Sequence, residues 1–264
     1  MKAGDIQRLL NIMQQLRNPD GGCPWDLQQT YRSIVPHTLE EAYEVADAIE
    51  RDNYADLQDE LGDLLFQVVF YAQLGSEENR FEFADVVQGI CDKLERRHPH
   101  VFANKVVADA DEQTRNWEQL KADERKAKAA EARPHSALDG IAHTLPAMSL
   151  AHKLQRRAAQ VGFDWPDEQG VMAKVEEELD EIRQAWADPQ ARAEEIGDLL
   201  FTCVNLARHA GLDAETVLRQ SNRKFENRFR AMELQLGRAD KPITAASADE
   251  MEQAWSIVKS NETH

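Results

Sequence analysis

Acidic side chains recur at helical spacing in the second half of the sequence. Glu178 and Glu181 lie three residues apart, and Glu195 and Asp198 repeat that spacing. Residues three apart share one helix face, so each pair points in one direction. If the two helices are antiparallel neighbours, these carboxylates meet in one cleft, where their repulsion favours a bound cation. An all-oxygen site suits Mg²⁺, with Mn²⁺ as a substitute.

A di-iron carboxylate bundle is the nearest competing site, because it also draws acidic ligands from neighbouring helices. That site requires Glu-x-x-His, whereas the corresponding positions here are acidic. They are Glu44, Asp63, Glu181 and Asp198. The absence of His and Cys ligands also disfavours zinc.

The acidic pattern occurs twice. The segment EEAYE at 40–44 is echoed by EELDE at 177–181, and ELGDLLF at 60–66 by EIGDLLF at 195–201. Two copies in the same order indicate an internal repeat. We expect a structural or weakly active repeat at 1–121, a linker at 122–144 and a catalytic repeat at 145–264. A candidate second metal site in the first repeat comprises Glu41, Glu44, Glu60 and Asp63.

The second repeat carries polar residues that the first lacks. Lys174 corresponds to His37, Arg192 to Leu57, Asn205 to Phe70 and Asn222 to Cys91. We therefore expect the second repeat to carry most of any catalysis.

Cationic and aromatic residues follow the second acidic motif. Lys224 and Arg228 lie four apart, a spacing that places both on one helix face and suits a polyphosphate. Trp255 and Lys259 add an aromatic surface and another cation. Together with the carboxylates, and without a P-loop, they indicate a nucleoside polyphosphate as ligand.

Composition excludes one large class of partners. The chain has 31 Lys and Arg residues against 48 Asp and Glu, a formal net charge of −17. Such a surface repels polyanions, so we expect no nucleic-acid partner. We find no apolar leader and no apolar stretch long enough to span a bilayer. We expect a cytoplasmic protein without a membrane partner.

Apolar residues recur with helical periodicity, which predicts an all-α protein of two tandem helical bundles. Apolar stretches at 64–74 and 199–207 predict that the protein forms a dimer. Helices are expected at 6–16, 39–51, 54–74, 83–97, 145–160, 171–187, 191–210 and 214–236, with a solvated helical extension at 121–133.

The chain resembles the MazG-type all-α nucleoside triphosphate pyrophosphohydrolases, whose hallmark is Glu-Glu-x-x-Glu followed by Glu-x-x-Asp. Matching segments include GGCPWD at 21–26, ERRHPHVF at 95–102, VGFDW at 161–165 and NRKFENRF at 222–229. The resemblance implies Mg²⁺-dependent hydrolysis of NTPs and dNTPs to the monophosphate and pyrophosphate. It also implies a homodimer of intertwined helices and a role in clearing unwanted nucleotides.

The resemblance assigns roles to individual residues. It implies that Glu178, Glu181, Glu195 and Asp198 hold the metal ion, and we expect Glu177 or Glu178 to act as the general base. The expected substrate-binding residues, from motif and resemblance together, are Lys174, Arg192, Asn205, Lys224, Arg228, Trp255 and Lys259. Two alternatives stay open: a sensor that binds a nucleotide or alarmone without turnover, and a non-enzymatic helical interaction protein.

Overall fold

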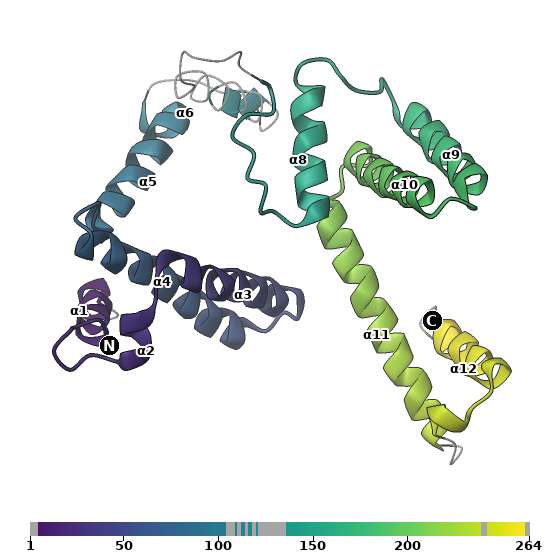
Figure 1. Cartoon of the computed structure of the whole chain (residues 1–264), viewed down its shortest axis with the longest axis horizontal. Coiled ribbons are helices and arrows are strands. Elements are labelled where there is room, and N and C mark those ends of the chain that lie inside the picture. The colour runs from purple at the N-terminus through teal and green to yellow at the C-terminus, as the bar shows by residue number, and fades with distance from the viewer. Residues whose placement is uncertain are drawn as a thin grey trace. The chain divides into compact units, whose positions relative to one another are not determined.

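The computed structural model describes residues 5–103, 109, 112–113, 116–117, 120, 136–238 and 242–261. The chain divides into two compact units, Met1–Lys121 and Ala122–His264. Every regular element in the described residues is a helix, which confirms the all-α prediction (Figure 1). The predicted helical extension at 121–133 lies outside the described residues.

The first unit contains helices that agree closely with the sequence pattern. They are α1 (Ile6–Leu16), α2 (Pro24–Gln28), α3 (Tyr31–Glu50), α4 (Tyr54–Glu77), α5 (Phe83–Arg97) and α6 (Pro99–Phe102). The predicted bounds of α1 and α5 are confirmed, whereas α3 begins at Tyr31 rather than at Leu39. The side chains and backbones of Thr30 and Ser33 exchange hydrogen bonds that start this helix, and α3 continues through Pro36.

Helices α3 and α4 form an antiparallel hairpin through a tight turn (Figure 1). Asp52 has a positive φ of 53°, and Asn53 caps α4 by accepting a hydrogen bond from the backbone N–H of Asp56. The Arg51 guanidinium bridges both helices, with Nε 2.7 Å from Asp47 Oδ2 and Nη1 2.9 Å from Asp56 Oδ2. These contacts fix the antiparallel arrangement that the acidic motifs require.

The core of the first unit gathers where α3 begins and α4 ends. Met13 from α1 and Ile34 from α3 pack against Val69, Phe70 and Leu74 from α4, and all are buried. The acidic motifs lie farther along the hairpin, toward its turn.

The second unit repeats the hairpin. Its elements are α8 (Ala147–Ala159), α9 (Glu168–Ala185), α10 (Pro189–His209), α11 (Ala214–Arg238), the short 3₁₀ helix η1 (Ile243–Ala245) and α12 (Ala248–Asn261). Asp167 caps α9 and Asp188 caps α10 through their carboxylates. Helices α9 and α10 pack side by side (Figure 1).

Two small cores join the remaining helices of this unit. Ala151, Val204 and Ala214 connect α8, α10 and α11. A second core is formed by Met232, Leu236, Ala254 and Val258, which hold α12 against the C-terminal half of α11. Searching the described helices for a membrane span, we find none that combines the required length with the required apolar character.

Candidate metal and phosphate site

A carboxylate cluster lies on the α9–α10 hairpin. Glu178 and Glu181 from α9 and Glu195 from α10 each direct one carboxylate oxygen to within 4.8 Å of the others. Glu178 is only 3% exposed, whereas Glu181 and Glu195 are half-buried. The short turn between the helices thus brings acidic residues from both motifs together.

Glu178 has an unsatisfied oxygen in this cluster. Its Oε2 is buried and has no hydrogen-bond partner, while its Oε1 lies 2.9 Å from Lys174 Nζ. A buried carboxylate oxygen without a partner is destabilising, and coordination to a cation satisfies it. Because all donors in the cluster are hard oxygens, its residues fit Mg²⁺ or Mn²⁺.

Lys174 supplies positive charge beside the cluster. Its Nζ lies 2.7 Å from Glu177 Oε1 and 3.9 Å from Glu181 Oε2. Hydrogen bonds to Glu177 and Glu178 raise the pKa of Lys174, so the amine stays protonated. The pKa of Glu181 is raised, chiefly because burial disfavours its charged form, with repulsion from Glu195 adding to this effect and Lys174 opposing it.

The fourth expected ligand lies at the edge of this arrangement. Asp198 is exposed on α10, one turn beyond Glu195, and does not join the cluster of three. Its position on the helix is the one that the motif predicts.

The first unit carries an equivalent cluster. Carboxylate oxygens of Glu41, Glu60 and Asp63 lie within 4.8 Å of one another, and Gln67 Nε2 donates to Glu41 Oε1 at 3.5 Å. Burial raises the pKa of Glu41 and of Glu60, and neighbouring acidic groups raise both further. Glu44, the remaining motif residue, is exposed and contributes to the raised pKa of Glu60.

The two clusters contain different positions of the shared motif. The first omits Glu44, which corresponds to Glu181, and the second omits Asp198, which corresponds to Asp63. Each motif position therefore joins a cluster in at least one of the two units.

Arg192 and Asn205 have partners within the chain. Arg192 Nη1 donates to the Trp186 carbonyl at 2.9 Å, and its guanidinium carbon lies 5.0 Å from the centre of the Trp186 ring. The buried Asn205 accepts a hydrogen bond of 2.9 Å from Arg208 Nε. Arg192 thus joins the end of α9 to α10, whereas the Asn205 contact lies within α10.

The other expected substrate-binding residues form a separate group on α11 and α12. Trp255 packs in the core between these helices, with its ring centre 5.5 Å from that of Phe225. Lys224 and Lys259 are exposed, and Arg228 is half-buried. Helix α12 packs against α11 (Figure 1).

Trp165, which is not among the expected site residues, packs against the first turn of α9. Its indole lies against Gly170 so closely that a Cβ built on that glycine would be 2.5 Å from Trp165 Cδ1. Gly170 precedes Lys174 by one helical turn, so the indole packs against α9 one turn before Lys174. In the sequence, Gly170 was the one feature that could have indicated this close contact with Trp165, because glycine has no side chain.

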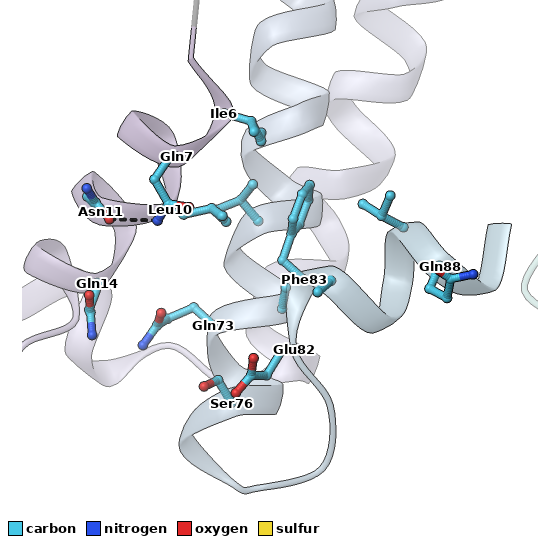
Figure 2. Close-up of a pocket in the computed structure, with 14 residues that line it drawn as sticks. Ile6, Gln7, Leu10, Asn11, Gln14, Gln73, Ser76, Glu82, Phe83 and Gln88 are labelled. Carbon is cyan, nitrogen blue, oxygen red and sulfur yellow. Dashed lines mark hydrogen bonds between the residues drawn. The ribbon is translucent and has the colours of Figure 1, made fainter. Parts of the chain in front are cut away.

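A groove in the first unit is distinct from both clusters. Figure 2 shows it between α1, α4 and α5, with Leu10 and Phe83 among its apolar lining and a hydrogen bond of 3.0 Å from Gln7 Nε2 to Asn11 Oδ1. Its described lining contains none of the acidic motif residues.

Both hairpins match the same protein family. Residues 29–102 and 168–232 match the family model described as the MazG nucleotide pyrophosphohydrolase domain. The chain is 52% identical over 261 residues to the nucleoside triphosphate pyrophosphohydrolase of Escherichia coli (strain K12), covering 97% of this chain and 98% of that protein. It is 40% identical over 254 residues to the nucleoside triphosphate pyrophosphohydrolase/pyrophosphatase MazG of Thermotoga maritima, covering 96% and 95%.

Proposed function

Because the chain belongs to the MazG nucleotide pyrophosphohydrolase family, we propose that it hydrolyses nucleoside triphosphates, NTPs and dNTPs alike, to the monophosphate and pyrophosphate. This reaction would clear unwanted nucleotides from a cytoplasmic pool. The observation that carries the proposal is the buried, unpartnered Oε2 of Glu178 within a cluster of three carboxylates.

Glu178, Glu181 and Glu195 would hold Mg²⁺, with Asp198 completing the set by a side-chain rotation. When bound, Mg²⁺ supplies charge neutralisation for the triphosphate and for the leaving pyrophosphate. Lys174 would contact the substrate's phosphates from the same side of α9. Helices α11 and α12 would also contribute to substrate binding if they approach a carboxylate cluster. Their contacts would come from Lys224, Arg228, Trp255 and Lys259.

In the proposed reaction, the oxygen of a water molecule attacks the α-phosphorus, and the bond from that phosphorus to the bridging oxygen breaks. Pyrophosphate leaves with the electron pair of that bond. The proton of the water passes to a carboxylate, for which Glu177 and Glu178 are the candidates, because Glu178 belongs to the cluster and Glu177 lies beside it.

The two clusters support a division of roles between the repeats. We propose that the repeat at 145–264 carries the catalysis and that the repeat at 1–121 is structural or weakly active, with 122–144 as linker. The first cluster has acidic ligands, but His37 replaces Lys174 beside it. Glu41, Glu60 and Asp63, with Glu44, would then form a metal site of lower activity.

We also propose a homodimer. Large apolar side chains on the α9–α10 hairpin are exposed in the single chain, with Leu179 at 39%, Ile196 at 40% and Leu200 at 53%. A second copy would cover such a surface. Light scattering in solution should give twice the chain mass, and the monomer mass would contradict the proposal.

The test of function is pyrophosphate release from a panel of NTPs and dNTPs, with and without Mg²⁺. Glu178→Gln should abolish release, because it removes a ligand charge while keeping the side-chain shape. Glu41→Gln is the matched control at the equivalent position of the first unit, and it should leave most of the activity in place.

Two outcomes would contradict the proposal. Release that is unaffected by Glu178→Gln but abolished by Glu41→Gln would assign catalysis to the first unit. No release by the wild type, combined with a nucleotide-dependent rise in melting temperature, would indicate a sensor that binds without turnover.

A further inference from the structure

The Lys174 amine lies among the carboxylates that would bind a metal ion in the second unit. Its Nζ lies 2.9 Å from Glu178 Oε1 and 3.9 Å from Glu181 Oε2, and both carboxylates belong to the cluster. A third carboxylate, that of Glu177, anchors the amine at 2.7 Å. An ammonium group therefore already neutralises part of the charge that a divalent ion would neutralise.

The first unit has a histidine in place of this lysine. His37 stands at the position equivalent to Lys174, and its Nδ1 pairs at 3.7 Å with Glu40, which is outside the cluster. Its ring centre lies 5.7 Å from that of Trp25. The same acidic hairpin thus occurs once with a neighbouring ammonium group and once with an imidazole directed elsewhere.

A metal ion and the Lys174 ammonium group would compete for the same carboxylates. Glu178 offers both cations one buried carboxylate, and two positive charges within a few ångströms repel strongly in a partly buried site. The lysine side chain is 29% exposed and has a flexible four-carbon stem, so its amine can leave the carboxylates for an anion nearby. A triphosphate is such an anion.

We propose that Lys174 is an exchangeable counter-ion, which neutralises the carboxylate cluster before metal binding, opposes the metal ion, and transfers to the substrate's phosphates. Metal and nucleotide then bind cooperatively, because each favours the state in which Lys174 has left the carboxylates. The inference rests on the proposed function, since it takes a nucleoside triphosphate as the anion. It adds a positioning role for Lys174 that a phosphate contact alone does not include.

The experiment measures Mn²⁺ binding without nucleotide, from the electron paramagnetic resonance signal of free Mn²⁺. All proteins are full-length and carry Glu41→Gln, which weakens binding to the first cluster. In this background Lys174→Gln should lower the Kd for Mn²⁺ by about tenfold, equivalent to about 1.4 kcal/mol. Lys153→Gln on α8 is the charge-matched control, because Lys153 is exposed and outside the cluster, and its Kd should stay within about twofold.

Lys174→Arg serves as the conservative variant. It keeps a positive charge beside the carboxylates, so its Kd for Mn²⁺ should remain close to that of the Lys174 protein. Circular dichroism verifies that each variant is folded. A lysine that is purely structural or purely phosphate-binding predicts an unchanged or raised Kd in Lys174→Gln. Either result would overturn the inference.

A second measurement tests the transfer to phosphate. Addition of an ATP analogue with a methylene group between the α- and β-phosphorus atoms should lower the Kd for Mn²⁺ by a larger factor with Lys174 than with Gln at this position. Equal factors would overturn the transfer step.

Pyrophosphate release separates the two proposals. If the wild type releases pyrophosphate and Lys174→Gln leaves the Kd unchanged, the counter-ion role is wrong and the hydrolase function stands. If the wild type releases none and Glu178→Gln leaves Mn²⁺ binding unaffected, the function fails and the inference fails with it.

Discussion

Arg17 binds the carboxylate of Glu77 through two hydrogen bonds, 2.8 Å from Nε to Oε1 and 2.6 Å from Nη2 to Oε2. Arg17 directly follows α1 and Glu77 ends α4, so the pair joins elements that are distant in sequence. The guanidinium also donates to the carbonyls of Asp26 and Gln29 and lies 5.3 Å from the centre of the Phe70 ring. It therefore connects the end of α1, helix α2 and the hairpin core.

Arg17→Met should destabilise the first unit by about 3 kcal/mol, because a partly buried carboxylate and two backbone carbonyls lose the guanidinium donor. Urea denaturation measures the change. Arg80→Met is the matched control, since the Arg80 side chain is 68% exposed and its pair with Glu78 should contribute less than about 1 kcal/mol. Equal losses in the two variants would contradict this account.

The Glu77 pair should make stability depend on pH. The hydrogen bond from Arg17 lowers the pKa of Glu77 below its usual value. The folded state then binds fewer protons than the unfolded state, so this contribution is complete above about pH 4.5 and is lost as the pH falls through the lowered folded-state pKa. The difference in unfolding free energy between wild type and Glu77→Gln should be constant from pH 7 to 5 and shrink below that range. A difference that grows on acidification would be incompatible with this assignment.

Alanine substitutions at Gly170 and Gly197 should have opposite effects on stability, because only Gly170 is in close contact with another side chain. Gly170→Ala introduces a Cβ at 2.5 Å from Trp165 Cδ1, so it should displace the indole, destabilise the second unit by about 1 kcal/mol or more and change tryptophan fluorescence. Gly197→Ala on α10 meets nothing within 4 Å, and the higher helix propensity of Ala should stabilise by about 1 kcal/mol. A destabilised Gly197→Ala protein would indicate that a second copy covers this face.

Mg²⁺ should raise the melting temperature through Glu178. Binding to the folded state adds about 1 to 3 kcal/mol at 5- to 100-fold excess of Mg²⁺ over Kd. In the Glu41→Gln background, EDTA should remove this gain and Glu178→Gln should prevent it. Differential scanning fluorimetry checks the result, with Lys153→Gln as a control that retains the gain. The same Mg²⁺ response in Glu178→Gln would place the ion elsewhere.

The long helices were predictable because their apolar periodicity is strong. The bounds of α1 and α5 agree with the predictions, but the start of α3 was missed. The expected start at 39 follows Pro36, whereas the Thr30 cap starts the helix earlier and α3 continues through the proline. The short helices α2 and α6 have too few residues to show periodicity.

The pairing of acidic motifs was predictable from spacing, whereas the choice of residues within each cluster was not. Spacing treats Asp63 and Asp198 alike, yet only Asp63 joins its cluster. The difference depends on side-chain rotamers and on neighbouring charges, which helical periodicity does not encode. For the same reason, the contacts of Lys174 with three carboxylates were not anticipated.

The position of the first-unit core has a consequence for local unfolding. Ile34, Val69 and Phe70 hold the hairpin where α3 begins and α4 ends, whereas Ala48 is the buried apolar residue of the described stretch 41–63. The half of the hairpin toward the turn therefore opens at a lower free energy than the half at the core. A cation bound by Glu41 and Glu60 would join the two helices in that weaker half, so its binding should slow amide hydrogen exchange near the turn.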